Sequence, residues 1–307
     1  MPRSPFAGSF FSSSPIFSPP DPSGSGGGCK PLVPGLYLVA TPIGNAEDIT
    51  LRALRVLKSA HVIACEDTRV TGKLASLHNI QTPRTAYHEH NATKARPKLI
   101  ERLKNGETVA LVSDAGTPLI NDPGYKLVQA CQAEDIHVTA LPGASSIIDG
   151  LVLSGLPSDR FLFAGYAPPK SAARKTWLAE LAEIQATLVL LESPKRLPAA
   201  LADMATVLGP RPAAMTRELT KLFEEVRRAP LDELATHYAE AGPPKGEVVM
   251  VIGPPDAASD QDLDLDGLLK RALETQSLRD AAQTVAVATG LPRKKVYARA
   301  LELAKAP

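Results

Sequence analysis

The chain has 307 residues and is 44% hydrophobic, which is enough to build about two domains with apolar cores. Its 34 basic and 33 acidic residues give a formal net charge of +1, so a contact with nucleic acid has to come from a local basic patch. Its three cysteines, Cys29, Cys65 and Cys131, lie far apart in no metal-ligand spacing, and no apolar run is long enough to span a bilayer; we therefore expect no bound metal, no membrane anchor and a reducing, cytoplasmic compartment.

The first 34 residues are expected to form a disordered leader. They consist mainly of Pro, Ser and Gly and show neither a helical nor a strand period, so they cannot bury enough apolar surface to offset the entropy of ordering. The run GSGGGCK at 24–30 superficially resembles a phosphate-binding loop. Because no strand precedes it and no helix follows it, we interpret it as a linker.

Residues 35–157 alternate between predicted strands and predicted helices. The strands are expected at 36–40, 61–65, 85–87, 108–112 and 138–141, and the helices at 49–59, 70–77, 93–103, 123–133 and 146–154. Thr93 is expected to cap the third of these helices and Gly106 to end it. The alternation is typical of a parallel sheet covered by helices on both faces, so we predict a first α/β domain over 35–157.

A joint rich in turn residues at 155–159 marks the boundary to a second domain. Beyond it, strands are predicted at 161–166, 186–192, 213–217 and 247–252, and helices at 171–181, 194–207 and 231–239. These elements predict a second α/β domain over 158–254.

The segment 255–307 is predicted to be a Pro- and Asp-rich linker followed by a small helical unit. Helices are expected at 268–274 and 278–289, with a capping box at Ser277–Asp280, and Gly290 and Pro292 mark the start of a third. That last helix carries Arg293, Lys294, Lys295, Arg299 and Lys305 against the single acid Glu302. The pattern indicates a helix-turn-helix unit with a basic, RNA-contacting helix; the alternative is a solvated face of an ordinary tail.

Four strands of the first domain end in loops of unusual composition, at 41–45, 66–69, 113–118 and 142–146. The carboxyl ends of parallel strands share one edge of the sheet, so these loops are expected to meet at a single cleft. Within the third loop, Gly116 lets a ligand approach the backbone, and Asp114 and Thr117 offer a carboxylate and a hydroxyl. Taken alone, this loop could equally be a plain turn between a strand and a helix.

Several common enzyme classes lack their signatures. No G-x-G-x-x-G follows a strand, so the commonest dehydrogenase and methyltransferase sheets are disfavoured. HExxH, paired cysteine and G-x-S-x-G motifs are also absent, which leaves zinc proteolysis and α/β-hydrolase chemistry without support.

Several long and ordered runs resemble one family, the ribosomal RNA small subunit methyltransferase I family of the tetrapyrrole methylase superfamily. The runs are GLYLVATPIGN at 35–45, DIT at 48–50, EDTR at 66–69, LVSDAGTPLINDPGY at 111–125, SGLPSDR at 154–160 and RELTK at 217–221. The similarity covers about residues 35–252, and SPKR at 193–196 is close to a further segment of the family. The C-terminal helices also resemble the tail of that family.

The resemblance implies two α/β domains, with a parallel sheet in the first and a mixed sheet in the second, and a cleft between them that binds S-adenosyl-L-methionine. It further implies a homodimer that methylates the ribose 2′-oxygen of a cytidine in the decoding region of 16S rRNA, in the 30S subunit. The cofactor-binding positions that match are Pro42, Gly44, Asn45, Asp114, Ala115, Gly116, Thr117, Ser145, Ser146, Met215, Arg217 and Glu218.

Removal of the ribose proton requires a base, since a neutral hydroxyl is a poor nucleophile. The candidates are Glu66 and Asp67, with Arg69 or, more weakly, Lys221 orienting phosphate or lowering the hydroxyl pKa. The alternative is that a Glu66–Arg69 ion pair only pins the loop and Asp67 caps the next helix.

RNA contacts are expected at Arg174 and Lys175 and at 293–295. Two other functions remain open at this point. One is methylation of a tetrapyrrole intermediate on the same fold, and the other is a non-catalytic role in ribosome assembly.

Overall fold

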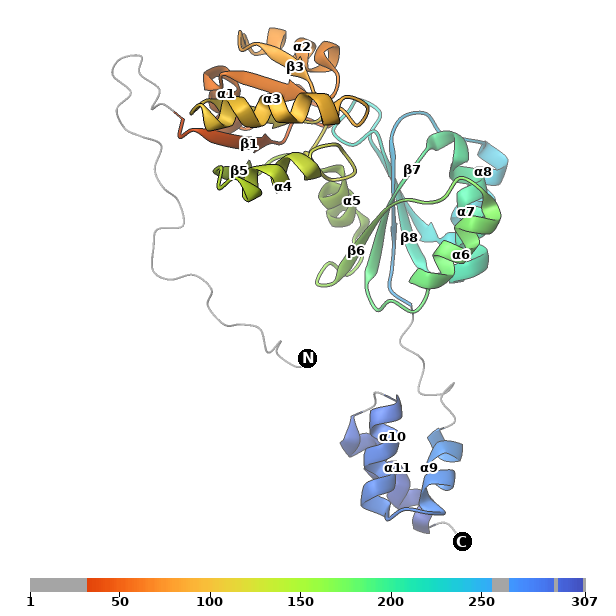
Figure 1. Ribbon diagram of the computed structural model, residues 1–307. Helices are drawn as coiled ribbons and strands as arrows, with labels where there is room; N and C mark the ends of the chain where they lie inside the picture. Colours follow the sequence, from red (N-terminus) through yellow and green to blue (C-terminus); the bar gives the residue numbers. More distant parts are fainter. Residues whose placement is uncertain (1–31, 256–264, 290–291, 306–307) are drawn as a thin grey trace.

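The computed structural model describes residues 32–255, 265–289 and 292–305 (Figure 1). The expected leader at 1–34 and the linker after residue 254 therefore lie almost wholly outside the described residues. Within the described part of the chain, the strands form two five-stranded sheets. No helix of this part is long and apolar enough to cross a membrane.

The first sheet has the order β3-β2-β4-β1-β5. Its strands are β1 (Gly35–Val39), β2 (Val62–Cys65), β3 (Arg84–Ala86), β4 (Thr108–Val112) and β5 (Val138–Leu141). All four neighbouring pairs are parallel, as predicted. Both β2 and β4 are buried throughout, because helices cover the two faces of this sheet.

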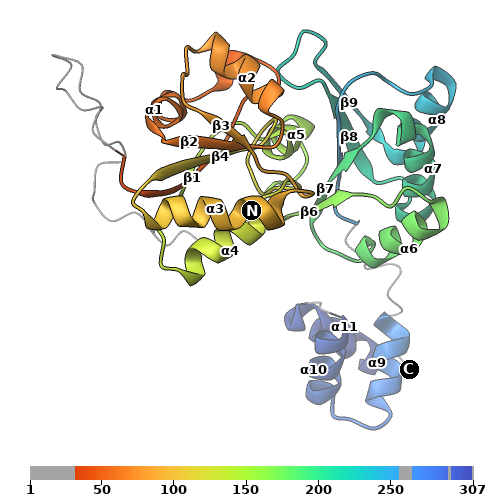
Figure 2. The same cartoon turned by 45° about the horizontal axis from the view of Figure 1, so that its top comes forward.

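Helices α1 (Leu51–Ser59) and α2 (Thr68–Leu77) pack on one face of the first sheet, and α3 (Ala92–Lys104) and α4 (Tyr125–Ala133) pack on the other (Figure 2). A short 3-10 turn, η1 (Ala46–Asp48), links β1 to α1. One expected boundary is corrected. Asn91 occupies the N-cap position of α3, so Thr93 lies inside the first turn of this helix and does not cap it.

The second sheet is mixed, with the order β6-β7-β10-β8-β9. Its strands are β6 (Phe161–Tyr166), β7 (Thr187–Glu192), β8 (Pro212–Arg217), β9 (Glu225–Pro230) and β10 (Val248–Ile252). The β6–β7 pair is parallel and the other three pairs are antiparallel. Strand β9 was not predicted from the sequence, since EVRRAP is half charged; it lies at the edge of this sheet and, among the described strands, pairs with β8 alone.

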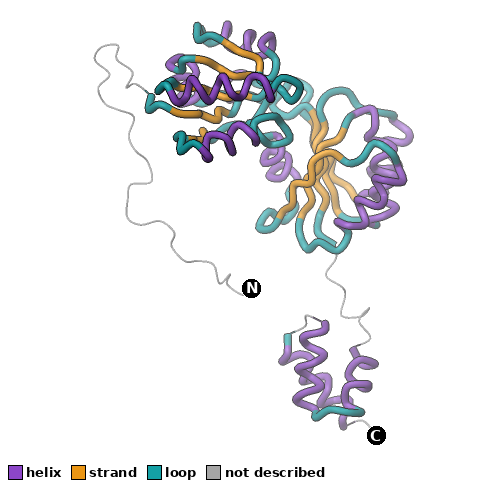
Figure 3. The backbone as a smooth tube through the Cα atoms, viewed as in Figure 1, coloured by secondary structure: helices purple, strands orange, loops and turns teal. Residues whose placement is uncertain are grey.

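The two faces of the second sheet are covered by different parts of the chain (Figure 3). One face packs against α6 (Ser171–Leu181), α7 (Leu197–Leu208) and α8 (Leu231–Ala241), with η2 (Pro194–Arg196) leading into α7. The other face packs against α5 (Ser146–Ser154), whose Ile147 and Leu151 contact Val189 and Val249. Helix α5 therefore follows the last strand of the first sheet but contributes its apolar side chains to the core of the second.

The C-terminal helices α9 (Leu265–Leu273), α10 (Leu278–Thr289) and α11 (Arg293–Lys305) share a core of their own. Leu269, Val285 and Val296 are buried in it. One half of the predicted capping box is present, since Ser277 Oγ accepts a hydrogen bond from the Asp280 N–H at 3.3 Å; the Asp280 carboxylate accepts from the Ser277 hydroxyl at 2.6 Å.

Candidate functional site

The four loops that follow β1, β2, β4 and β5 meet at one edge of the first sheet, as predicted. Thr41 and Gly116 exchange backbone hydrogen bonds of 3.0 and 2.9 Å. The Asp67 N–H donates to Asp114 Oδ1 at 3.0 Å, and Thr117 Oγ1 donates to the Ala144 carbonyl at 3.3 Å. The loop after β4 is therefore tied to each of the other three.

The loop between β4 and α4, called the central loop below, has a strained backbone at several residues. Leu119 and Asn121 have φ values of 73° and 64°, in the left-handed region that non-glycine residues seldom occupy. Gly124 has a φ of 143°, and a Cβ atom there would lie 2.8 Å from Leu119 Cδ1. Such conformations persist only where the surrounding structure enforces them, and they cluster at functional sites.

The central loop lines a cavity of about 420 Å³ between the two domains, which is within the range of small-molecule sites. Six of the expected cofactor-binding residues line it: Asp114, Ala115, Gly116, Thr117, Ser145 and Ser146. The second domain closes the cavity with the ends of β6 and β7, the start of β10 and Leu219 of the turn after β8. Leu219 lies in the run 217–221 that carried the family resemblance, but the sequence did not indicate the other contributions, which are Tyr166, Leu191–Pro194 and Gly246–Val249.

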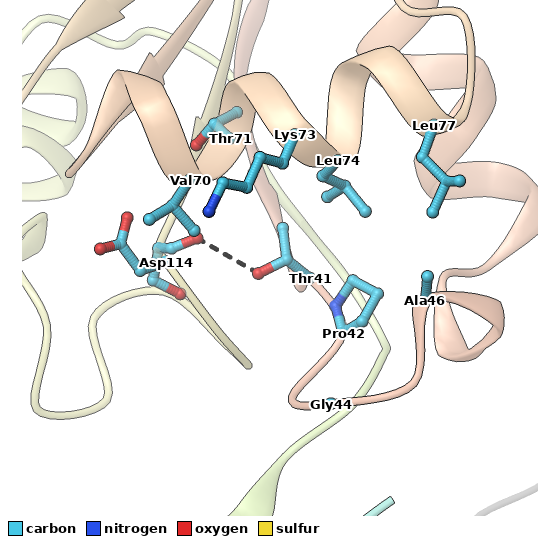
Figure 4. Close-up of a pocket in the computed structure, with 11 residues that line it drawn as sticks. Thr41, Pro42, Gly44, Ala46, Val70, Thr71, Lys73, Leu74, Leu77 and Asp114 are labelled. Atoms are coloured by element: carbon cyan, nitrogen blue, oxygen red, sulfur yellow. Dashed lines mark hydrogen bonds between the residues drawn. The ribbon is translucent and has the colours of Figure 1, made fainter. Parts of the chain in front are cut away.

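A smaller cavity of about 250 Å³ lies beside the first and shares Asp114 with it. Pro42 and Gly44 line this second space. Figure 4 shows the side chains of Val70, Lys73, Leu74 and Leu77 projecting from one side of α2 toward Pro42 and Ala46. Their spacing of three and four residues places them on one face of the helix.

The first expected cofactor loop also joins the two domains. The Asn45 N–H donates to Thr220 Oγ1 of the second domain at 2.9 Å. A Cβ atom on Gly44 would lie 2.5 Å from Lys221 Cγ and 2.8 Å from the Leu219 carbonyl oxygen. Only a glycine permits this approach of the two loops.

The three expected cofactor residues of β8 and its following turn do not line either cavity. Met215 is fully buried in the core against α6, α7 and α8, so its side chain faces away from the cleft. The side chain of Arg217 donates to Glu225 at 2.7 Å. Glu218 accepts from Lys221 Nζ at 2.9 Å and from the Glu247 N–H at 3.0 Å.

These contacts assign Arg217 and Glu218 to ion pairs at the rim of the second sheet. Lys221, the weaker catalytic candidate, belongs to the same network and also lies 3.2 Å from Glu247. Burial opposes its charge, but the bond to Glu218 and the charge of Glu247 outweigh that effect and raise its pKa.

In the loop after β2, the expected cap of α2 by Asp67 is present, but the expected partner of Arg69 is not. Asp67 caps α2 by accepting from the Arg69 N–H at 2.8 Å, and its carboxylate pairs with the Arg69 guanidinium at 2.7 Å. The hydrogen bonds from Arg69 lower the pKa of Asp67 to about 2, so this carboxylate is a weak base. The ion pair of Arg69 is thus formed with Asp67 and not with Glu66.

Glu66 and Asp122 are two carboxyl groups near this edge whose pKa values are raised. Burial, followed by the charge of Asp114, raises the pKa of Glu66. Burial and then the charge of Glu66 raise the pKa of Asp122 to about 6, against a hydrogen bond with Ser113. Asp122 lines the cavity between the two domains. It was not among the expected site residues, although it lies inside the run 111–125 that carried the family resemblance.

The expected RNA-binding residues fall into two groups, one buried and one exposed. The Arg174 side chain is 3% exposed and pairs with Asp203 at 2.6 Å, which corrects its assignment as an RNA contact. Lys175 is 46% exposed on the same helix. Arg293, Lys294 and Lys295 are exposed on α11.

Comparison with known proteins gives the same family at the level of sequence. The family model described as tetrapyrrole (corrin/porphyrin) methylases matches residues 35–235, and the model of the RsmI C-terminal HTH domain matches residues 259–304. Two proteins described as ribosomal RNA small subunit methyltransferase I are similar to the chain. That of Mesorhizobium japonicum is 50% identical over 275 residues, with 89% of this chain and 94% of that protein covered. That of Erythrobacter litoralis is 51% identical over 274 residues, with 89% and 97% covered.

Solved structures resemble the chain over 71% of its length. The crystal structure of uroporphyrin-III-C-methyltransferase from Thermus thermophilus has a TM-score of 0.52 and 25% identity, with 71% of this chain and 93% of that chain covered. That of the cobalt precorrin-4 methyltransferase CbiF has a TM-score of 0.54 at 17% identity, with 71% and 94% covered, and it supports the fold alone. From these matches over the two sheets and the C-terminal helices, the chain belongs to the ribosomal RNA small subunit methyltransferase I family, within the tetrapyrrole methylases.

Proposed function

We propose that this protein uses S-adenosyl-L-methionine to methylate the ribose 2′-oxygen of a cytidine in 16S rRNA, in the decoding region of the small ribosomal subunit. One observation carries the proposal. The cavity between the two domains is lined by the DAGT and SS loops, in a chain about half identical to proteins described as ribosomal RNA small subunit methyltransferase I. The 2′-oxygen, the cytidine and the decoding region come from the family resemblance.

The lining of the cavity fits this cofactor chemically. S-adenosyl-L-methionine supplies a methyl group activated by a positively charged sulfonium, and it also carries an ammonium group and hydroxyls. The carboxylates of Asp114 and Asp122 favour a cationic ligand, and the hydroxyls of Ser145 and Ser146 can donate to or accept from its polar groups. Gly116 leaves room for close approach to the backbone, and its φ of 76° is one that glycine adopts without strain.

Asp122 is the proposed proton acceptor for the ribose hydroxyl. General bases work best with a pKa near the working pH, and the pKa of Asp122 is raised to about 6 by burial and by Glu66. Asp67, by contrast, has a pKa of about 2 because Arg69 binds it. Glu66 acts on the reaction through its charge on Asp122, so it is a positioning residue in this proposal.

Local basic groups supply the RNA contact. Exposed Lys175 and the exposed side chains at 293–295 remain in the proposed contact set after Arg174 is removed. The homodimer implied by the family is part of the proposal, and sedimentation equilibrium of the purified chain tests it.

Methyl transfer from labelled S-adenosyl-L-methionine to unmodified 30S subunits tests the function directly. The expected product is a single 2′-O-methylcytidine, located by mapping the 16S rRNA. Parallel reactions with free 16S rRNA and with a uroporphyrin-type tetrapyrrole define the substrate class, because the similar Thermus thermophilus enzyme is a uroporphyrin-III-C-methyltransferase. Cofactor binding without any methyl transfer would instead indicate a non-catalytic role.

A further inference from the structure

The smaller cavity of about 250 Å³, called the α2 cavity below, has no role in the proposed function. It lies between α2 and the loop after β1 (Figure 4). All of its described lining residues fall within 41–114, so they belong to the first domain. Asp114 is the one described residue that it shares with the cavity between the two domains. The α2 cavity is therefore a separate space beside the proposed cofactor site.

The walls of the α2 cavity are largely apolar and partly open to solvent. Pro42 lies on one side, and Val70, Leu74 and Leu77 project from α2 on the other (Figure 4). Val70 is 39% exposed and Leu77 is 62% exposed, and neighbouring exposed apolar side chains often mark ligand grooves. A volume of about 250 Å³ is at the lower limit for a whole small molecule. The space fits one flat group of a larger ligand.

Lys73 adds a positive charge to this apolar space. It lines the cavity and is exposed, and Figure 4 shows its ammonium nitrogen on the side where Thr41 and Asp114 lie. Among the described residues, no carboxylate forms an ion pair with Lys73. Arg69, one turn earlier on the same helix, is by contrast paired with Asp67 at 2.7 Å. An unpaired ammonium beside an apolar slot favours a ligand with an anionic group next to a flat ring.

A nucleotide of single-stranded RNA has both of these features. Proteins hold unpaired bases against aromatic or apolar side chains, while cationic groups bind the phosphate backbone. S-adenosyl-L-methionine carries two positive groups, the sulfonium and the ammonium, and one carboxylate, so its net charge is not attracted by Lys73. Because Asp114 borders both cavities, a nucleotide in the α2 cavity would lie beside the proposed site of methyl transfer.

We propose that the α2 cavity binds the nucleotide next to the target cytidine in the RNA chain, an inference that rests on the proposed function. The base lies between Pro42 on one side and Leu74 and Leu77 on the other, and Lys73 binds the phosphate. The cavity thereby holds the RNA strand so that the neighbouring ribose faces the cofactor.

The polar groups of the α2 cavity are largely used within the protein. The Thr41 hydroxyl donates to the Ser113 carbonyl at 3.2 Å, and Asp114 Oδ1 accepts from the Asp67 N–H at 3.0 Å. Few hydrogen bonds are therefore left to read the edge of the base. We expect the site to require a base at this position and to accept any of the four.

The phosphate contact is tested by the affinity of the chain for 30S subunits at several salt concentrations. In Lys73→Ala, the affinity is expected to fall, and the slope of log K against log salt is expected to fall by about one, the value for one lost phosphate contact. Lys73→Arg is expected to retain the wild-type slope. Lys98→Ala removes an exposed lysine of α3, on the opposite face of the first sheet, and is expected to change neither quantity. The Kd for S-adenosyl-L-methionine is expected to stay within twofold in all three variants.

The base contact is tested by a double-mutant cycle with 30S subunits reconstituted to carry an abasic nucleotide on either side of the mapped cytidine. On one side, the lesion is expected to raise the Kd for the wild-type chain about 5-fold or more, whereas exchange of one base for another there has little effect. In Leu77→Ser, the Kd for the intact subunit is expected to be raised already, and the lesion adds little. Val33→Ser is the matched control, because Val33 is 61% exposed and precedes β1 at the other edge of the sheet. It is expected to keep the full effect of the lesion.

Three outcomes would overturn the inference. They are an unchanged salt slope in Lys73→Ala, an undiminished effect of the abasic nucleotide in Leu77→Ser, and a large loss of cofactor affinity in Lys73→Ala, which would assign the α2 cavity to the cofactor. Thermal melting of each variant separates loss of binding from loss of folding. RNA affinity is measured without methyl transfer, so a wild-type chain that binds RNA through Lys73 but transfers no methyl group would refute the proposed function alone.

Discussion

Asp122 shows how one side chain acquires a chemical role from its surroundings. In the sequence it belongs to a turn, NDPG, and nothing separates it from other turn aspartates. In the folded chain it is partly buried at the cavity wall, beside Glu66 and Asp114. Burial and the neighbouring charges disfavour its ionised form, which keeps its affinity for a proton high.

A pH profile tests this role. The base must be ionised, so kcat/KM is expected to rise with pH through about 6, the pKa of Asp122. Asp122→Asn is expected to remove this rise and to lower the rate about 100-fold or more, because general-base catalysis contributes about 10²–10⁴. Glu66→Gln removes the charge that raises the pKa of Asp122, so the rise is expected at lower pH. An unchanged profile in both variants would exclude Asp122 as the base.

The raised pKa of Asp122 also affects the free energy of unfolding, which is expected to fall with rising pH where kcat/KM is expected to rise. Between the ordinary pKa of 3.8 and about 6, the native chain holds a proton on Asp122 that the unfolded chain has released. The free energy of unfolding contributed by this group therefore decreases as pH rises through that window. Urea titrations of the wild-type chain and Asp122→Asn at several pH values measure the difference.

Arg174 was expected to contact RNA at the surface, but the structure places it in a buried ion pair. Its guanidinium donates to Asp203 and to the carbonyls of Pro168, Pro169 and Ala199. Removing one partner of a buried pair leaves the other charge without compensation, at a cost of about 3–5 kcal/mol.

Arg174→Ala is therefore expected to lower the free energy of unfolding by about 3 kcal/mol or more. Lys175→Ala, one residue further along α6, is expected to change stability by less than about 1 kcal/mol, because Lys175 is half exposed and its contact with Asp203 is long, at 3.5 Å. Urea denaturation measures the first effect, and the salt dependence of RNA affinity measures any contribution from Lys175. A stable Arg174→Ala with weakened RNA binding would restore Arg174 as an RNA contact.

At the scale of elements, the cleft depends on two loops that approach each other across the domain junction. The loop after β1 contacts the turn after β8 through Asn45 and Thr220, and Gly44 leaves no room for a side chain there. The two turn residues Glu218 and Thr220 have positive φ values of 50° and 63°. A packed, strained junction of this kind fixes the width of the cavity between the domains.

Gly44→Ala is expected to weaken cofactor binding about 10- to 100-fold, because misplacement of a site by about 1 Å has effects of this size. Gly72→Ala on α2 is the matched control, since a Cβ atom there meets nothing within 4 Å. Alanine in a helix is favoured over glycine, so this control is expected to be neutral or slightly stabilising. Calorimetric titration with S-adenosyl-L-methionine compares the two variants, and equal affinities would contradict the role of the junction.

At the scale of the whole molecule, the C-terminal helices form a separate core and carry the exposed basic residues Arg293, Lys294 and Lys295. Arg299, one of the basic residues of the last helix, pairs with Asp266 of α9 and Glu302 of α11 and so holds the unit together. Arg293, Lys294 and Lys295 remain exposed at the start of α11. The RNA contact proposed for the C-terminal helices is therefore limited to the first turn of α11.

Replacement of Arg293, Lys294 and Lys295 by alanine is expected to reduce affinity for the 30S subunit and to leave the cofactor Kd unchanged. The slope of log K against log salt should fall by about one for each phosphate that the variant no longer binds. Deletion of residues 256–307 should reduce affinity at least as much. If neither change affects affinity, the helical unit has a structural or dimer-forming role.

The sequence by itself determined the order of helices and strands, the parallel first sheet and the protein family. Periodicity and sequence motifs depend on residues that are close together in the chain, so they can be recognised without the fold. The sequence also located the loops that line the cavity, since strand ends of a parallel sheet must share an edge. The charged edge strand β9 could not be predicted in this way, because its apolar residues are few and only pairing with β8 identifies it.

Only the tertiary structure decided which polar side chains face the cavity. Met215 faces the core and Arg174 is buried, whereas Asp122, Tyr166 and Glu192 reach the cleft. These outcomes depend largely on contacts between residues far apart in the sequence, such as Arg174 and Asp203, and on the burial that shifts a pKa. The position and pKa of a side chain that depend on such contacts have no local pattern in the sequence. They can be determined only from the packed structure of the two domains.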